Sequence, residues 1–210
     1  DKNKIIQLAM NGKGNPIYTN MSPVMSKFLW NAPEEKVDPQ KAKQILEEKK
    51  LLPMEFTLKV PNSSKIYLDT AQSIREQLKD IGITVNLEVI EWATWLSDVY
   101  TNRKYVASLA GLAGKMEPDA ILRRYTSTYA KNFTNFNNAR YDMLIEEAKR
   151  TSNETKQVEN YKEAQKILSE EQAAIFLMDP NTVIATEKGI EGFEFYPLPY
   201  LNFAKLYFKK

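Results

Sequence analysis

The sequence contains neither cysteine nor histidine, and each absence narrows the chemistry open to it. Without cysteine the chain has no disulfides, thiol nucleophiles or sulfur-bound metals, which suits a reducing cytoplasm or a cell surface where folding does not depend on oxidation. Without histidine it lacks the commonest general base and the commonest metal ligand. An enzyme of this composition would have to work with carboxylates, lysines or tyrosines alone.

Long apolar runs and an excess of one charge are also lacking. No stretch reaches the roughly 18 apolar residues of a membrane span, and no signal peptide opens the chain, which starts in a helical pattern as if cut from something longer. The 29 basic and 27 acidic residues are interspersed. Clustered lysines alternate with glutamates, as on a solvated helix face, so we expect no nucleic-acid partner. These lysines are Lys41, Lys43, Lys49 and Lys50.

Hydrophobic periodicity in the first half predicts alternating helices and strands. Alternation predicts strands over 54–61 and 83–91, and a helix over 66–81 connects them. A strand, helix, strand unit of this length favours a right-handed parallel crossover. We expect a short helix over 91–100 and a third strand over 105–114.

The helix before the first strand has a clear start. Asp38 followed by Pro39 is typical of an N-cap and a first helical turn. Three apolar residues then supply the buried face that we predict for this helix. They are Ala42, Ile45 and Leu46.

The second half is more helical. One predicted helix buries Tyr141, Leu144, Ile145 and Ala148, and a longer one buries Val158, Tyr161, Ala164, Leu168 and Ile175. The longer helix begins either with a capping box of Thr151 and Glu154 or with Asn153 as its cap. We expect buried strands over 174–180 and 182–186, and an aromatic tail over 192–208 with irregular or strand structure. The fold class is therefore α/β with a mixed sheet.

The stretch Val106 to Tyr125 does not fit a nucleotide site. A phosphate-binding loop needs four residues between its glycines and a hydroxyl after its lysine. Gly111 and Gly114 are separated by two residues, and Met116 follows Lys115. A dinucleotide fingerprint would need three glycines after the first strand of such a unit.

Paired carboxylates do not predict catalysis either. The candidate pairs are Glu146 with Glu147 and Glu170 with Glu171. Neighbouring residues on a helix point in different directions, so neither pair can flank one substrate. We predict no enzymatic activity and no cofactor.

Four segments carry a resemblance to a known family. They are "DKNKIIQLAMNGKG", "DPQKAKQILEEKKL", "AQSIREQLKDIGITVNLEVIEWATWL" and "YDMLIEEAKRTSNETKQVENYKEAQKILSEEQAAIFLMDP". In order and spacing they resemble the C-terminal part of the oligopeptide-binding family, extracellular solute-binding protein family 5. Its members are solute receptors of ABC importers for peptides, dipeptides and nickel.

The resemblance implies a fold, partners and a location. It implies that residues 1–210 are one domain fragment, the C-terminal peptide-binding lobe of a type II periplasmic-binding-protein-like fold, with a largely parallel sheet flanked by helices. Residues from about 190 to 210 resemble the segment that returns to a missing N-terminal lobe. An oligopeptide would be held between the lobes, and a membrane ABC permease would be the partner. The location implied is extracytoplasmic, in the periplasm or at the cell surface, with the longer protein anchored as a lipoprotein.

The resemblance also implies which loop faces the ligand. In the stretch that corresponds to Val106–Tyr125, peptide-binding members often have a "GW", followed by an aspartate that pairs with the ligand's free amino terminus. Leu112 replaces the tryptophan, and no aspartate precedes Glu117, so that Gly114 and Lys115 fall near the anchor position. Three alternatives remain open. Lys115 favours an acidic or carboxylate-bearing ligand, a longer peptide is held mainly through its backbone, or Lys115 simply points to water.

A tryptophan completes the predicted site. Trp92 matches the family's "EW" tryptophan, which lines the peptide cleft, although packing in the core or hinge is the alternative. Trp95 is expected in the core. The predicted ligand-binding residues are Trp92, Gly111, Leu112, Gly114 and Lys115. The predicted function is peptide import without catalysis, and the alternative is a surface receptor for a signalling peptide or a module that binds a partner protein.

Overall fold

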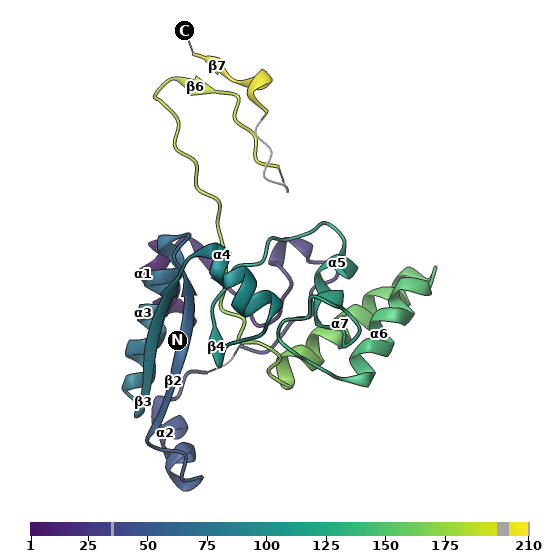
Figure 1. Ribbon diagram of the computed structural model, residues 1–210. Helices are drawn as coiled ribbons and strands as arrows, with labels where there is room; N and C mark the ends of the chain where they lie inside the picture. The colour runs from purple at the N-terminus through teal and green to yellow at the C-terminus, as the bar shows by residue number, and fades with distance from the viewer. Residues whose placement is uncertain (35, 197–201, 210) are drawn as a thin grey trace.

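The computed structural model describes residues 1–34, 36–196 and 202–209. A three-stranded parallel sheet forms one half of the body (Figure 1). Its strands are β2 (Met54–Pro61), β3 (Ile83–Ile90) and β4 (Ala107–Ser108), in the order β3-β2-β4. The predicted parallel crossover is confirmed. The predicted strand over 105–114 is wrong in extent, because after Ser108 only the Leu109 amide still bonds to β2, at the Lys59 carbonyl (3.2 Å).

Helix α3 (Lys65–Lys79) connects β2 to β3 and packs on one face of the sheet. Its first turn is capped by the Ser64 hydroxyl, which accepts a hydrogen bond from the Ile66 amide. The alternating apolar residues of the strands pack against it, with Val60 and Val85 buried. Helix α1 (Lys2–Met10) packs against α3 in turn.

The chain after β3 packs near the opposite face of β2. It forms the single turn α4 (Trp92–Thr94) and continues as a π-helix, η2 (Trp95–Thr101). Trp95 is buried, as predicted, and its indole N–H donates to the Ser108 hydroxyl (2.9 Å). That hydroxyl donates to the Lys59 carbonyl (2.9 Å), so the π-helix is joined to both β4 and β2.

A second core lies in the helical half of the body. The short elements α5 (Pro118–Leu122) and η3 (Arg123–Tyr125) pack on the hairpin of α6 (Ala139–Arg150) and α7 (Glu154–Glu170). The four predicted buried positions of α6 are confirmed. Of the two capping alternatives, the Asn153 side chain caps α7 by accepting from the Lys156 amide. Ile175 is not part of α7 and is 74% exposed, because the helix has already ended and Gln172 turns the chain with a φ of 50°.

Residues 11–30 form an N-terminal arm that runs from α1 to the helical half of the body. Strand β1 (Gly14–Pro16) pairs antiparallel with β5 (Met178–Pro180), and the 3₁₀ turn η1 (Pro23–Met25) follows. The buried Gln165 side chain of α7 holds this arm, since it accepts from the Thr19 hydroxyl (3.0 Å) and donates to the Phe28 carbonyl (2.7 Å).

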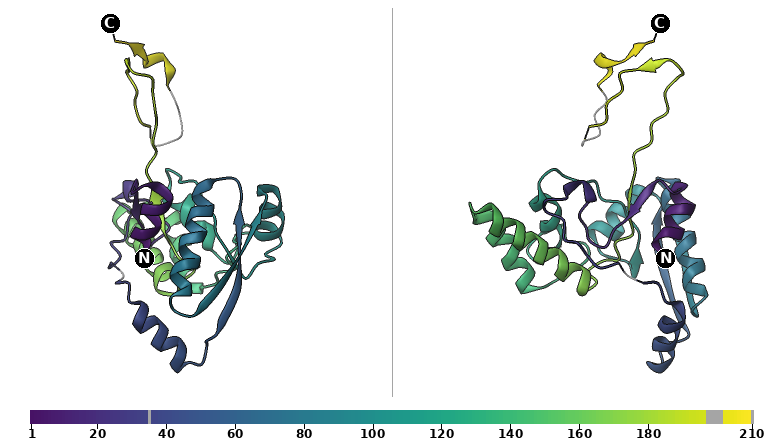
Figure 2. Two further views of the ribbon diagram at one scale, coloured as in Figure 1. Left: turned by 90° about the vertical axis from the view of Figure 1, so that its left-hand side faces the viewer. Right: turned by 180° about the vertical axis from the view of Figure 1, so that it is seen from behind.

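Two further expectations are wrong in part. Helix α2 (Pro39–Glu48) is capped by Asp38 as predicted, but it buries no residue, and Ile45 is 40% exposed. Figure 2 shows the reason: α2 extends away from the rest of the body. The strand expected over 174–180 is limited to β5.

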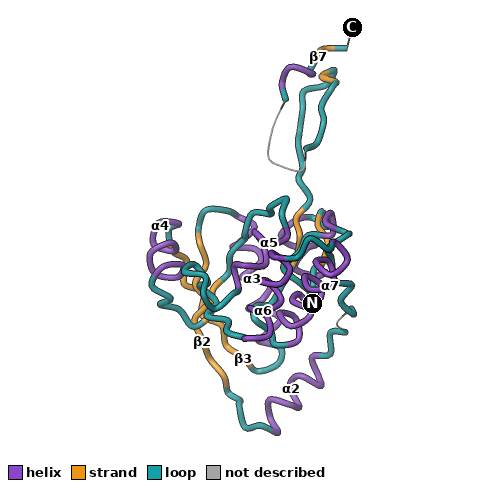
Figure 3. Tube along the Cα trace, turned by 90° about the vertical axis from the view of Figure 1, so that its right-hand side faces the viewer, coloured by secondary structure: helices purple, strands orange, loops and turns teal. Residues whose placement is uncertain are grey.

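The strand expected over 182–186 is not formed, and its apolar side chains are exposed. Figure 3 shows this segment as a loop that leaves the body. In the described chain its backbone forms no hydrogen bond, so it has no partner strand there.

The tail ends in a small antiparallel pair far from the body (Figure 2). Strand β6 (Ile190–Glu191) pairs with β7 (Tyr207–Phe208), and the turn η4 (Phe203–Lys205) precedes β7. Residues 197–201 of the predicted tail lie outside the described residues. Among the described helices, none is long and apolar enough to cross a membrane.

Candidate functional site

The candidate site lies where the three parallel strands end. Because the strands are parallel, their carboxyl ends meet at one edge of the sheet, which is where open α/β sheets bind ligands. The first turn of α3 follows β2, Trp92 follows β3, and the loop 109–117 follows β4. Figure 1 shows α4, which begins with Trp92, at the upper end of the sheet. The structure therefore brings Trp92 and Gly111 to the same edge, and Leu112, Gly114 and Lys115 follow Gly111 in the same loop.

Trp92 is the exposed end of an aromatic stack. It is 39% exposed, and its ring stacks on that of Trp95, with centroids 5.0 Å apart and planes inclined by 4°. Trp95 is 1% exposed and also contacts Tyr100 and Phe133, at centroid distances of 6.0 and 5.7 Å. The buried Trp95 ring holds the Trp92 indole in one orientation, and part of the indole surface remains free for a ligand.

Loop 109–117 is fixed at alternate residues. The Leu109 amide donates to the Lys59 carbonyl, and the Gly111 amide donates to the Tyr67 hydroxyl (3.2 Å). Further along, the Ala113 carbonyl accepts from the Arg124 guanidinium (3.0 Å). These three bonds hold the backbone of the loop against β2, α3 and η3.

The predicted loop residues are open to solvent. The Leu112 side chain is 44% exposed, and a Cβ added at Gly114 would meet nothing within 4 Å. Lys115 is exposed and has no ion pair among the residues that the structure describes. Over the same part of the chain, the backbones of Leu112 and Gly114 form no hydrogen bond.

Tyr67 and Arg124 hold the loop, and the sequence alone does not predict either of them. Tyr67 lies 44 residues before the glycine that it contacts, and Arg124 lies 11 residues after Ala113. Neither contact leaves a local pattern. The only signal was the helix start at Ser64, which places the first turn of α3 at the carboxyl edge.

Burial sets the electrostatics of the core behind the loop. It raises the pKa of the Tyr125 phenol to about 12, although nearby Arg124 acts in the opposite direction. Burial also raises the pKa of Tyr141 well above its usual range, and its hydroxyl donates to the Leu122 carbonyl (2.6 Å). Both phenols are therefore neutral at physiological pH and serve the core. Among the described residues, no group of three or more acidic side chains is placed to hold a metal ion.

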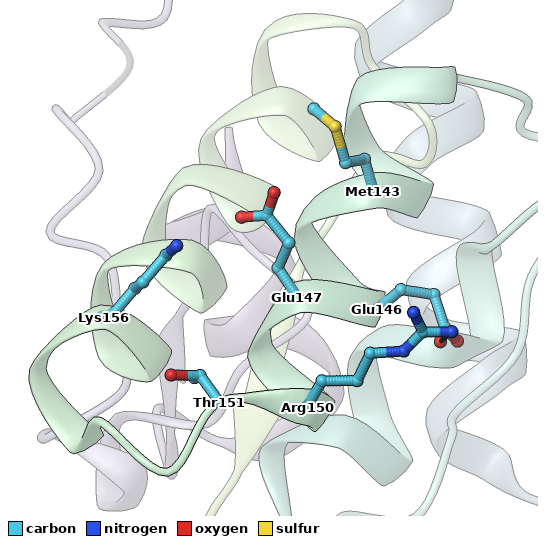
Figure 4. A pocket seen from close by; sticks show the side chains of 6 residues that line it. All are labelled: Met143, Glu146, Glu147, Arg150, Thr151 and Lys156. Carbon is cyan, nitrogen blue, oxygen red and sulfur yellow. Dashed lines mark ion pairs between the residues drawn. The ribbon is translucent and has the colours of Figure 1, made fainter.

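A hollow elsewhere on the surface does not form a site of this kind. Figure 4 shows it at the connected end of the α6–α7 hairpin, where residues 151–153 join the two helices. It is lined by Met143, Glu146, Glu147, Arg150, Thr151 and Lys156. The two glutamates point apart: Glu146 pairs with Arg150 (3.6 Å), whereas Glu147 accepts from the Asn160 side chain (3.4 Å). They do not converge on a common point.

Comparison with known proteins gives consistent matches. The model of the bacterial extracellular solute-binding proteins, family 5 (middle part), matches residues 1–133. The oligopeptide-binding protein AppA of Bacillus subtilis is 27% identical over 94% of this chain and 40% of its own length. The peptide transport periplasmic protein SapA of Haemophilus influenzae is 27% identical over 91% of this chain and 37% of its own length. The chain thus spans about 40% of the length of these relatives.

Solved structures agree with the fold. AppA from Bacillus subtilis in complex with a nonapeptide matches all of this chain and 45% of its own, with a TM-score of 0.83 and 26% identity. The substrate-binding protein CtaP from Listeria monocytogenes matches all of this chain and 45% of its own with a TM-score of 0.87 at 21% identity, a likeness of fold alone. These matches confirm the predicted class, an α/β lobe of the type II periplasmic-binding kind with a parallel sheet and flanking helices.

Proposed function

Because the chain belongs to the bacterial extracellular solute-binding proteins, family 5, we propose that it is the C-terminal peptide-binding lobe of an ABC importer's substrate-binding component. The relatives that it matches include peptide-binding and peptide-transport proteins. In this proposal the ligand is an oligopeptide held between this lobe and an N-terminal lobe of the same longer protein. Binding shifts the population from an open to a closed form, and no bond of the peptide is broken.

One observation carries the proposal: a fixed but exposed surface at the carboxyl edge of the parallel sheet. Trp92 is held by Trp95, and loop 109–117 is held by three hydrogen bonds, yet their outer surfaces have no partner in the described chain. A preformed surface loses little conformational freedom when a ligand binds, which favours affinity.

Each predicted residue has a distinct role on this surface. Trp92 supplies a flat ring for side chains of varied shape, and Leu112 adds an apolar contact. Gly114 lets the ligand approach the backbone closely, and Gly111 holds the loop in place through its amide. Lys115 stands near the position where an amine-binding aspartate would be expected, so it favours an acidic side chain or a carboxylate on the ligand.

The tail supports the two-lobe arrangement. Residues 181–196 rise away from the body, and the aromatic side chains near their end and beyond are exposed (Figure 2). Phe195 is 66% exposed and Phe203 is 69% exposed. We propose that residues from about 190 to 210 pack on the N-terminal lobe, where this apolar surface would be buried. The whole protein would act outside the cytoplasm, anchored as a lipoprotein, with a membrane permease as its partner.

Peptide titration tests the proposal. The longer protein that carries this lobe is titrated with a pool of short peptides and with the same pool N-acetylated, by calorimetry and tryptophan fluorescence. Saturable binding of both pools is expected, because this chain has no aspartate at the loop position where other members bind the free amine of the peptide. Loss of binding on acetylation would mean that another carboxylate holds the amine. Absence of binding to either pool would overturn the peptide-binding function.

A further inference from the structure

Among the described residues, Tyr67 forms the one hydrogen bond that reaches from the helix after β2 to the loop after β4. Its hydroxyl accepts the hydrogen bond of the Gly111 amide at 3.2 Å. The Tyr67 ring is half-buried and packs against the core between α3 and the sheet. The hydroxyl is therefore held by a rigid ring on a regular helix, and it presents a fixed acceptor to the loop.

The same contact explains why residue 111 is a glycine. A Cβ added there would lie 2.9 Å from the Tyr67 hydroxyl oxygen, closer than such atoms approach in proteins. The next nearest atoms are ring carbons at 3.5 and 3.6 Å, which is ordinary contact. The obstacle is thus the hydroxyl alone. At Gly114 an added Cβ would meet nothing within 4 Å, so the restriction is specific to position 111.

We propose that Tyr67 is a positioning residue of the ligand-binding surface: it fixes loop 109–117 at Gly111 and so sets the affinity of the peptide site without facing the ligand. This inference rests on the proposed function for its ligand, but the contact itself is independent of that ligand. Tyr67 fixes the loop between two other anchors, at Leu109 and at Ala113. Leu112 lies between the last two anchored residues, so its place on the surface follows from them.

A double-mutant cycle in the longer protein tests the positioning role. Tyr67→Phe removes the acceptor and keeps the ring, and we expect about fivefold weaker binding of the peptide pool. Gly111→Ala is expected to weaken binding by roughly fivefold or more when Tyr67 is present, because the new methyl group meets the hydroxyl. In the Tyr67→Phe background the same change should cost less than about twofold, since only ordinary contacts remain.

Two controls separate positioning from general damage. Gly114→Ala should have the same effect on binding in both backgrounds, because no Tyr67 atom is near it. Tyr105→Phe loses a comparable hydroxyl bond, to the Phe133 carbonyl, at the opposite end of β4. Its effect should be additive with that of Gly111→Ala. Melting temperatures of all variants identify any that fail to fold.

Amide exchange provides a readout that needs no ligand. Tyr67→Phe should speed hydrogen exchange of the Gly111 amide by about fivefold or more and leave the Leu109 amide, which bonds to Lys59, unchanged. Unchanged Gly111 exchange, or additive effects of Tyr67→Phe and Gly111→Ala on binding, would overturn the positioning role while peptide binding stands. If the wild-type protein binds no peptide, the proposed function falls, and with it the role in affinity; the exchange result then decides only whether Tyr67 holds the loop.

Discussion

The indole of Trp92 lies flat on the indole of Trp95, with ring centroids 5.0 Å apart and an interplanar angle of 4°. One ring is 39% exposed and the other 1% exposed, so a single stack extends from solvent into the core. The two tryptophans are three residues apart, at the start of α4 and the start of the π-helix. Their different burial predicts different consequences of removing each ring.

Replacement of Trp92 by alanine should weaken peptide binding more than it weakens the fold. The variant loses the contact between the exposed ring and the ligand. It also loses the stack on Trp95, and an aromatic pair of this kind is worth about 1 kcal/mol beyond the area that it buries. We expect peptide affinity to fall about tenfold while the melting temperature changes by only a few degrees. Calorimetric titration and thermal unfolding of the same sample measure both. Unchanged affinity would show that Trp92 only covers Trp95.

Replacement of Trp95 by alanine should have the opposite balance. The buried ring contacts Trp92, Tyr100 and Phe133, and its N–H bonds to Ser108. Its loss leaves a cavity and removes the hydrogen bond that the Ser108 hydroxyl accepts, at a cost of about 3–5 kcal/mol in the free energy of unfolding. Urea denaturation measures this cost. A loss below about 1 kcal/mol would contradict the core position of Trp95.

Where local pattern decides the structure, the sequence was a good guide. In α6, Tyr141, Leu144 and Ile145 recur at helical spacing, and the helix buries them. The parallel strands β2 and β3 were also predictable, because their apolar residues alternate and pack on α3. Both features depend on residues that are close in the chain.

Where a distant partner decides the structure, the sequence was not sufficient. The segment 182–186 has the composition of a strand, but a strand also needs a neighbour that supplies hydrogen bonds. Ile45 of α2 has the spacing of a buried residue, but nothing in the described chain covers it fully. The contact of Tyr67 with Gly111 joins residues 44 positions apart, so no local pattern announces it. The family resemblance located the loop but not its anchors.

Gln165 gives a prediction about how the N-terminal arm is held. Its amide oxygen accepts from the Thr19 hydroxyl and from the Trp30 amide (3.2 Å), and its nitrogen donates to the Phe28 carbonyl. Gln165→Leu keeps much of the volume but removes the acceptor of the buried Thr19 hydroxyl and the partners of the half-buried Trp30 amide and Phe28 carbonyl, so we expect a loss of about 2–4 kcal/mol. Urea denaturation measures it. Gln44→Leu on the exposed helix α2 is the control, with an expected change within about 0.5 kcal/mol.

Tyr125 predicts how stability depends on alkaline pH. Its pKa is raised from the usual 10.0 to about 12 because burial disfavours the phenolate. The unfolded chain therefore releases this proton near pH 10, while the folded chain still holds it. The contribution of this proton to the free energy of unfolding is fully present below pH 10. It is lost as pH rises toward about 12, and the total loss is about 3 kcal/mol.

Tyr125→Phe should reduce this alkaline slope. Phenylalanine cannot ionise, so the difference in free energy of unfolding between pH 9 and about pH 11 should be smaller in the variant. Denaturation at a series of pH values measures the slope. An equal slope in the variant and in the wild-type protein would show that the Tyr125 phenol ionises normally.

Lys115 predicts the charge preference of the peptide site. It is exposed on loop 109–117 and, in the described part of the chain, has no ion pair. If it faces the ligand, one position of the bound peptide should prefer glutamate to glutamine. A series of peptides with glutamate or glutamine at each position in turn, titrated into the longer protein, gives the ratio of the two affinities. Lys115→Gln should reduce that ratio about two- to fivefold, as removal of an exposed ion pair does, and added salt should reduce it in the wild-type protein. Lys104→Gln makes the same charge change near the opposite end of β4 and should leave the ratio as it is. A ratio that is unchanged by Lys115→Gln throughout the series would mean that this lysine points to water and that the peptide is held through its backbone.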